Sequence, residues 1–361
     1  MITPVRTIKV LIVEDSAIVR DLLVRILEGD PAIRVVHCAR NGIEAIEALA
    51  HHSPDVITMD IHMPHMDGYE ATRRIMETQP RPIVIVTASY DADDVSKTFR
   101  ALEAGAVAFI EKPPGVCSPD HAKCAEKLVA MVKAMSEVRV VRRSSRTRPP
   151  APPRANRPGS PARPDGIDLV AIGASTGGPP VLNAILGALP KPFPVPIVIV
   201  QHIATGFVQG LADWLTTSAG LPVHIARDGQ RALPGHAHLA PDACQMRIAA
   251  GGLISCTDSV MENGLRPSVS HLFRSVAQTY GKRAAGVLLT GMGRDGADEL
   301  KLMRERGAVT IAQDRESCVV NGMPGAAVQI DAAMHVCTPL EIAALLSSLV
   351  TAPAAGPSSA K

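Results

Sequence analysis

Gly173-Ala174-Ser175-Thr176-Gly177-Gly178 is the stretch of this sequence that best indicates its fold. An apolar run over residues 167–172 precedes it, and apolar residues at helical spacing follow it over 181–189. A serine therefore stands on a glycine-flanked turn between a predicted strand and a predicted helix, where the helix N-terminus can stabilise an oxyanion. The stretch matches the pattern G-x-S-x-G, which taken alone is also compatible with a tight turn or a phosphate-binding loop.

The composition predicts a soluble protein of two domains. The chain has 361 residues, which is long for a single domain. Of these residues 46% are hydrophobic and 20% are charged, a composition typical of globular proteins. A net charge of +2 and an aromatic content of 2% argue against a nucleic-acid partner. Since there is no apolar run of about 18 residues and no signal peptide, we expect no membrane insertion. Seven scattered cysteines without metal-ligand spacing indicate reduced thiols and a cytoplasmic location.

The first part of the chain alternates apolar strands with amphipathic helices. Strands are expected over residues 9–13, 35–37, 56–59, 82–86 and 107–110, with a helix after each of the first four. Such an alternation predicts a doubly wound parallel sheet.

Polar residues follow these predicted strands at their carboxyl ends, where doubly wound sheets bind ligands. They are Glu14, Asp15, Asp60, Thr87 and Lys112. Three carboxylates at one sheet edge repel each other unless a cation joins them, and hard oxygen ligands suit Mg²⁺. With Mg²⁺ present, Asp60 could accept a phosphoryl group, with Lys112 and Thr87 near the transferred group.

These residues make positions 5–125 resemble a response-regulator receiver domain, which implies a flavodoxin-like fold. The motifs that carry the resemblance are Val13-Glu14-Asp15-Ser16, Met59-Asp60-Ile61-His62-Met63-Pro64, Met66-Asp67-Gly68, Val86-Thr87-Ala88 and Phe109-Ile110-Glu111-Lys112-Pro113. The resemblance implies that a histidine kinase of the CheA type phosphorylates Asp60. It also implies that Thr87 and Phe109 form a switch pair, and that a cis peptide bond precedes Pro113.

The same resemblance implies a ligand set for Mg²⁺. Asp15 and Asp60 would bind the ion together with the His62 carbonyl, and Glu14 would contribute through water. We interpret the side chains of His62 and His65 as exposed loop residues rather than a transition-metal pair.

Residues 126–165 are expected to contain the end of a helix and then a linker. From Val138 to Pro164 there are eight arginines, seven prolines and no acidic residue. Such a segment cannot bury a core, so we expect an extended tether. The alternative is that the basic run docks on an acidic surface. Residues 351–361 are expected to be a disordered tail.

Residues 166–350 are expected to form a second parallel α/β domain. Strands are predicted over 167–172, 196–200, 284–289 and 309–312, with a small antiparallel insertion over 236–257 that turns at Gly251-Gly252.

Three residues of this second domain each stand just past the carboxyl end of a separate predicted strand: Ser175, His202 and Asp295. A serine nucleophile needs a base, and the base needs a carboxylate that orients it, so the three predict an acyl-transfer hydrolase. Their order in the chain differs from the Ser, acid, His order of α/β-hydrolases. Three other base candidates, interpreted as structural or surface residues, are His236, His238 and His271.

Residues 167–350 resemble the methylesterase domain of CheB-type chemotaxis proteins, which implies a Rossmann-like sheet. The motifs are Ile172 to Pro179, Val200-Gln201-His202, Arg266-Pro267-Ser268-Val269, Leu289 to Ala297, Ala312-Gln313-Asp314 and Asn321-Gly322-Met323-Pro324. The resemblance implies a Ser175, His202 and Asp295 triad, with the Met292 N–H and Thr176 around the oxyanion. Mild departures from the family pattern are Arg294, where asparagine is frequent, and Asn321, where an aromatic residue is frequent.

The implied activity is hydrolysis of glutamate methyl esters on chemoreceptors with release of methanol, and deamidation of selected receptor glutamines. The receiver would cover the Ser175 edge until Asp60 is phosphorylated. We expect no cofactor for the ester hydrolysis and a monomeric chain. Three rivals are an inactive receptor-docking module, a receiver-controlled transcription factor and an esterase with a different substrate.

Overall fold

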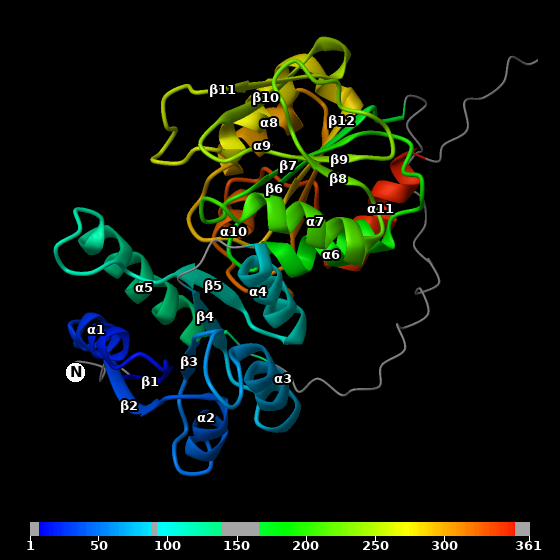
Figure 1. Cartoon of the computed structure of the whole chain (residues 1–361). Coiled ribbons are helices and arrows are strands. Elements are labelled where there is room, and N and C mark those ends of the chain that lie inside the picture. Colours follow the sequence, from blue (N-terminus) through cyan, green and yellow to red (C-terminus); the bar gives the residue numbers. More distant parts are fainter. Residues whose placement is uncertain (1–6, 88–91, 139, 141–165, 351–361) are drawn as a thin grey trace, which may run out of the picture. The chain divides into compact units, whose positions relative to one another are not determined.

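The chain is represented by a computed structural model that describes residues 7–87, 92–138, 140 and 166–350 (Figure 1). The described residues form two compact units, one within Met1–Ala151 and one within Pro152–Lys361. The predicted Arg/Pro-rich linker lies almost wholly outside the described residues, and the predicted tail over 351–361 lies outside them entirely. Among the described helices, none combines the length and the apolar character that a membrane span requires.

The first unit contains a parallel sheet of five strands in the order β2-β1-β3-β4-β5. The strands are β1 (Ile8–Val13), β2 (Ile33–Ala39), β3 (Val56–Met59), β4 (Ile83–Thr87) and β5 (Ala108–Glu111). The helices are α1 (Ala17–Glu28), α2 (Gly42–Ala48), α3 (Gly68–Thr78), α4 (Ala92–Ala104) and α5 (His121–Ser136). The strand order reverses between β1 and β3, which is where such a sheet forms its ligand crevice.

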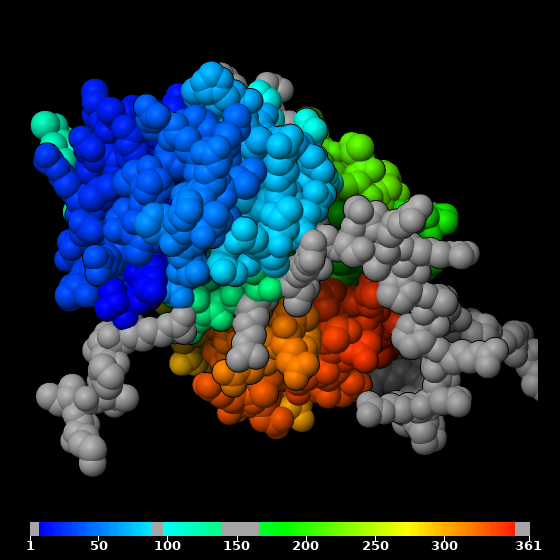
Figure 2. All heavy atoms as spheres, turned by 90° about the horizontal axis from the view of Figure 1, so that it is seen from below, coloured from blue at the N-terminus to red at the C-terminus, as the bar shows by residue number. Residues whose placement is uncertain are grey.

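Helices cover both faces of this sheet. Helix α1 packs against α5, while α2, α3 and α4 pack side by side as a second layer. The β1 residues from Val10 onward are fully buried because both faces are covered, which explains their continuous apolar run. Figure 2 shows this unit, in blue to cyan, as a closely packed body. The predicted doubly wound fold is confirmed.

The second unit contains a parallel sheet of seven strands in the order β14-β13-β12-β6-β7-β9-β8. The strands are β6 (Leu169–Ala174), β7 (Ile197–Gln201), β8 (Val223–Ile225), β9 (Ala237–Leu239), β12 (Ala284–Leu288), β13 (Val309–Gln313) and β14 (His335–Cys337). The helices are α6 (Gly178–Ala188), α7 (Val208–Ala219), α8 (Val269–Thr279), α9 (Ala297–Glu305), α10 (Met323–Gln329) and α11 (Pro339–Val350). Helices α11, α6 and α7 pack as one series, and α10, α9 and α8 as another.

The predicted antiparallel insertion is partly correct. Strands β10 (Gln245–Ala249) and β11 (Leu253–Thr257) form an antiparallel hairpin that turns through Gly251 and Gly252, whose φ angles are 71° and 76°. Strand β9, however, pairs in parallel with β7 and belongs to the large sheet. The prediction failed there because His238 interrupts the apolar pattern of a strand only three residues long.

Candidate functional site

The three predicted catalytic residues follow strands that are neighbours in the large sheet. Ser175 follows β6, His202 follows β7 and Asp295 lies in the loop after β12, while the sheet order runs β12-β6-β7. Because all three strands are parallel, their carboxyl ends meet at one edge. The structure therefore brings the nucleophile, base and acid candidates to the same edge of the sheet.

Asp295 is held at the N-terminus of α8. Its Oδ1 accepts hydrogen bonds from the Ser268 hydroxyl at 2.9 Å and the Ser270 N–H at 3.1 Å, and its Oδ2 accepts one from the Val269 N–H at 2.7 Å. A carboxylate is stabilised at this end of a helix by free N–H groups and the helix dipole. The carboxylate is therefore fixed in direction as well as in place.

The environment of Asp295 keeps it ionised. Burial would raise its pKa, but the close approach of His202 and the donors of Ser270 and Val269 outweigh burial and lower the pKa to about 2. The His202 Nε2 lies 3.0 Å from the Asp295 Oδ2. The Nε2–H bond does not point at the Asp295 oxygen. The contact is therefore a close polar pair rather than an aligned hydrogen bond.

Ser175 lies on a turn whose backbone is fixed from a neighbouring strand end. Its N–H donates to the Thr290 carbonyl at 3.0 Å, and the Thr290 hydroxyl donates to the Thr176 carbonyl at 3.0 Å. Gly177 then has a φ of 78°, which favours glycine. In the described part of the chain no hydrogen bond joins the Ser175 hydroxyl to His202, and such catalytic bonds often form only when substrate binds.

Gly291 brings the predicted oxyanion donor close to Ser175. A Cβ atom at Gly291 would lie 2.6 Å from the Ser175 Cβ, so the two backbones approach too closely for any other residue. The next N–H is that of Met292, whose side chain is 40% exposed. Within the described residues, neither the Met292 N–H nor the Thr176 N–H donates to a backbone carbonyl. Both predicted donors are thus available beside the serine turn.

Sequence reasoning missed the groups that support the acid. Gln245, at the start of β10, accepts a hydrogen bond from the Ser268 N–H at 2.8 Å and donates to the Leu265 carbonyl at 3.0 Å. It is fully buried and fixes the loop that leads into α8. In the sequence Gln245 is only one polar residue within the predicted insertion, and neither its burial nor its partners can be read from the pattern.

The other histidines of this unit have different environments. His238 is fully buried in β9, and His224 and His236 form a stacked pair with ring centroids 5.1 Å apart. His271 lies on α8 with its Nδ1 3.7 Å from a Glu262 oxygen. None of them has a described contact with Ser175.

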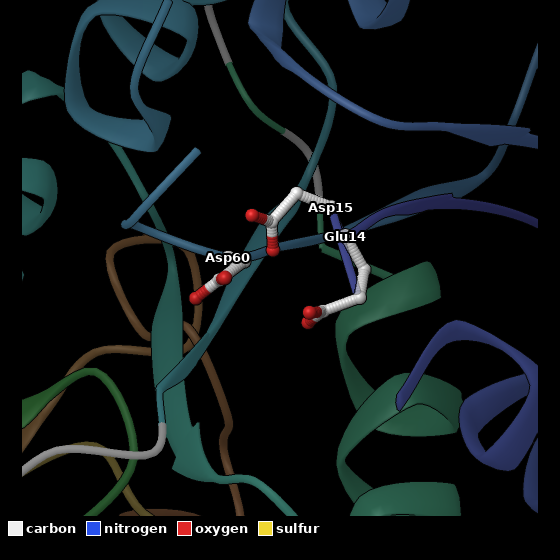
Figure 3. A group of neighbouring side chains, drawn as sticks. All are labelled: Glu14, Asp15 and Asp60. Carbon is white, nitrogen blue, oxygen red and sulfur yellow. The ribbon is translucent and has the colours of Figure 1, made fainter. Parts of the chain in front are cut away.

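The first unit gathers three carboxyl groups at the carboxyl edge of its sheet. Glu14 and Asp15 come from the turn after β1, and Asp60 comes from the end of β3 (Figure 3). One ligand oxygen from each lies within 4.8 Å of the others, which fits a single hard cation. Lys112 places its Nζ 2.8 Å from a Glu14 oxygen and 2.9 Å from an Asp60 oxygen.

Burial dominates the electrostatics of this acidic group. It raises the pKa of Asp60 and of Glu14, while the ammonium group of Lys112 opposes the rise in both. Thr87 is buried at the end of β4, and the Phe109 ring packs edge-on against Phe99 with centroids 5.9 Å apart.

Two predicted features of this unit have different outcomes. The side chain of His62 is exposed, as expected for a residue offering only its carbonyl. The prediction of a cis bond before Pro113 is wrong. The cis bonds among the described residues precede Pro192 and Pro267 instead. The trans isomer is the lower in energy for an X–Pro bond unless the surroundings impose the other.

Comparisons with known proteins agree with this arrangement. The family model for CheB methylesterase matches residues 170–346, and that for the response regulator receiver domain matches residues 10–116. The protein-glutamate methylesterase/protein-glutamine glutaminase of Nitrosospira multiformis is 54% identical over 95% of this chain and 97% of that protein. The corresponding protein 4 of Geobacter metallireducens is 52% identical over 95% of this chain and 99% of its own.

The crystal structure of the Thermotoga maritima CheB methylesterase catalytic domain is 37% identical, covers 51% of this chain and 99% of that chain, and has a TM-score of 0.49. With identities above 50% over nearly the whole length of two relatives, this chain belongs to the protein-glutamate methylesterase/protein-glutamine glutaminase family, with a receiver domain followed by a CheB methylesterase domain.

Proposed function

We propose that this chain hydrolyses glutamate methyl esters on chemoreceptors, releasing methanol, and deamidates selected receptor glutamines. The activities named for its relatives support the proposal. The observation that carries it is the ionised Asp295 lying 3.0 Å from His202 at the strand ends that also position Ser175.

In the proposed mechanism His202 takes the proton of the Ser175 hydroxyl, and the Ser175 Oγ attacks the ester carbonyl. With Nε2 of His202 beside Asp295, the ring nitrogen left for Ser175 is Nδ1. The N–H groups of Met292 and Thr176 bind the oxyanion. Methanol leaves with the proton from His202, and a water molecule activated by His202 then hydrolyses the acyl-enzyme.

Deamidation uses the same steps on a glutamine side chain. Ammonia replaces methanol as the leaving group, and the protonated His202 supplies the proton that the departing amine requires. Both reactions leave a glutamate on the receptor, so one site serves both without a cofactor.

The test is methanol release from methylated receptors in membranes, compared with hydrolysis of small soluble esters. Ser175→Ala should lower release by several orders of magnitude. Near-normal release by this variant would refute the assignment. If the normal chain hydrolyses small soluble esters but releases no methanol from receptors, the result would favour an esterase with a different substrate.

For the receiver, we propose that a histidine kinase of the CheA type phosphorylates Asp60. Asp15, Asp60 and the carbonyl of His62 would hold Mg²⁺, with Glu14 acting through water; the ion offsets the negative charge of the transferred phosphoryl group. The Lys112 ammonium, already 2.9 Å from Asp60, is placed to contact that group. Thr87 and Phe109 would then move as the switch pair.

Phosphorylation is proposed to activate the esterase by shifting the receiver between two states, the unphosphorylated one covering the Ser175 edge. A small-molecule phosphodonor with Mg²⁺ should raise methanol release by the full chain, and Asp60→Asn should abolish the increase while leaving the basal rate. Activation of the Asp60→Asn chain by the phosphodonor would contradict the proposal.

The free state of all seven cysteines supports a reducing, cytoplasmic location for this activity. The proposal takes the chain as a monomer, which sedimentation of the full chain would test.

A further inference from the structure

The side chain of Gln201 reaches the backbone of both the nucleophile candidate and the base candidate. Gln201 is the last residue of β7 and lies opposite Ala174, the last residue of β6. Its side chain is buried, with 4% of its surface exposed. Ser175 and His202 each follow one of these two paired residues directly.

The Gln201 amide ties the two catalytic turns together. Its Nε2 donates to the Ser175 carbonyl at 2.8 Å and to the His202 carbonyl at 2.8 Å, so both of its N–H groups are used. The His202 N–H adds a third tie by donating to the Ala174 carbonyl at 2.9 Å. Both partners are carbonyl oxygens, which only accept hydrogen bonds, so the amide atom that faces them must be the nitrogen and the orientation of the group is unambiguous.

The oxygen of the same amide explains why the next helix begins with glycine. The Gln201 Oε1 is buried and accepts no hydrogen bond within the described structure. It lies against Gly178, the first residue of α6, where a Cβ atom would be 2.1 Å away. The positive end of the α6 dipole stabilises an oxygen placed there.

We propose that Gln201 is the positioning residue of the Ser175 and His202 pair. It fixes the separation of the two backbones, so that only side-chain rotation is needed to bring the Ser175 hydroxyl to the imidazole. This rests on the proposed function of Ser175 as nucleophile and His202 as base. Misplacing reacting groups by about 1 Å can cost about 100-fold in rate, so losing both ties should be visible in kinetics.

The first experiment compares Gln201→Met with the normal full chain. The rate at which a fluorophosphonate labels Ser175 reports the activated serine without any receptor: the Ser175 oxygen bonds to phosphorus, fluoride leaves, and His202 takes the proton. We expect labelling and the kcat of methanol release to fall together by about 10-fold to about 100-fold, with KM unchanged. Labelling of Gln201→Met at the normal rate would overturn the proposal.

Thr310→Val is the matched control. The Thr310 hydroxyl is buried and joins two backbone groups, donating to the Ala332 carbonyl at 2.7 Å and accepting from the Met334 N–H at 3.1 Å. It lies in the amino-terminal half of β13, away from the catalytic edge. The Thr310→Val variant should have a lower unfolding temperature than the normal chain but the same labelling rate. If labelling falls equally in Thr310→Val, the effect is loss of stability and the proposal is wrong.

Gln201→Glu gives a second measurement that does not depend on the methionine variant folding. Facing two carbonyl oxygens, the new side chain can donate only when protonated. The labelling rate of Gln201→Glu relative to the normal chain should therefore rise as pH falls, and a ratio that does not change with pH would overturn the proposal. If Ser175→Ala abolishes labelling but the normal chain releases no methanol from receptors, the proposed function fails while the role of Gln201 stands.

Discussion

His238 should make the second unit unstable in mild acid. Its side chain is fully buried, its Nε2 accepts a hydrogen bond from the Leu233 N–H at 3.2 Å, and its Nδ1 has no partner in the described structure. Burial, followed by the charges of His224 and His236, lowers the pKa of His238 from 6.5 to about 4. The folded protein therefore holds this ring neutral at a pH where the unfolded chain protonates it.

The sign and size of the effect follow from that difference. The stabilisation is complete above the unfolded pKa of 6.5 and is lost as pH falls toward about 4. One pKa unit corresponds to about 1.4 kcal/mol, so the full loss is about 3 kcal/mol, of which about 2 kcal/mol is lost by about pH 5. Such a loss is a large fraction of the stability of an ordinary domain.

The assay is urea unfolding of the full chain followed by tryptophan fluorescence. The chain has one tryptophan, Trp214, on α7, so the signal reports only the unit that contains His238. His238→Gln is the comparison, because its oxygen can replace Nε2 as the acceptor for Leu233 but cannot be protonated in this range. The difference in unfolding free energy between the two chains should shift by about 2 kcal/mol between about pH 7.5 and about pH 5. A difference that stays constant over that range would refute the reasoning.

Three further changes test the two sites. Asp295→Asn should lower fluorophosphonate labelling by about 10⁴-fold, because a neutral amide cannot orient and stabilise the imidazolium; a loss below about 10-fold would contradict this role. Gly291→Ala should cost about 1 to 3 kcal/mol in urea unfolding and slow labelling, since its Cβ would lie 2.6 Å from the Ser175 Cβ; unchanged labelling would show that the turn adapts. In calorimetry Mg²⁺ should raise the unfolding temperature of the first unit, because binding adds about 2.7 kcal/mol to its unfolding free energy at 100 times the Kd. Asp15→Asn should remove the effect, and equal shifts in both chains would place the ion elsewhere.

The sequence predicted the parts of the fold that local patterns determine. Buried parallel strands appear as apolar runs, and their polar residues were found at the carboxyl ends, which is why Ser175 and Asp60 could be assigned to sheet edges. The strands β8 and β14 were not predicted, because three residues are too few to show a pattern. Strand order was also beyond the sequence pattern, since β12 lies beside β6 although more than a hundred residues separate them.

The candidate sites divide in the same way. The acidic residues at the edge of the receiver sheet and the three residues Ser175, His202 and Asp295 were proposed from strand-end positions. The structure brings the acidic oxygens within 4.8 Å of one another and places His202 3.0 Å from Asp295, at the sheet edge where Ser175 also lies. The groups that hold these residues in place could not be found from strand-end positions. The Ser268 hydroxyl reaches Asp295 across 27 positions, and Gln201 looks like any polar strand end until its pairing with β6 is known.

The hairpin β10–β11 sets a lower limit on how far this enzyme could be shortened. A designer seeking a minimal esterase would keep the parallel sheet and delete the hairpin as a surface decoration. Gln245 at its base binds the loop that leads to Ser268, and the β10 residue Ile248 donates its N–H to the Ser275 hydroxyl of α8. Deleting the hairpin would therefore release the start of the helix that holds the acid. The smallest active version of the domain should have to retain it, although no hairpin residue takes part in the chemistry.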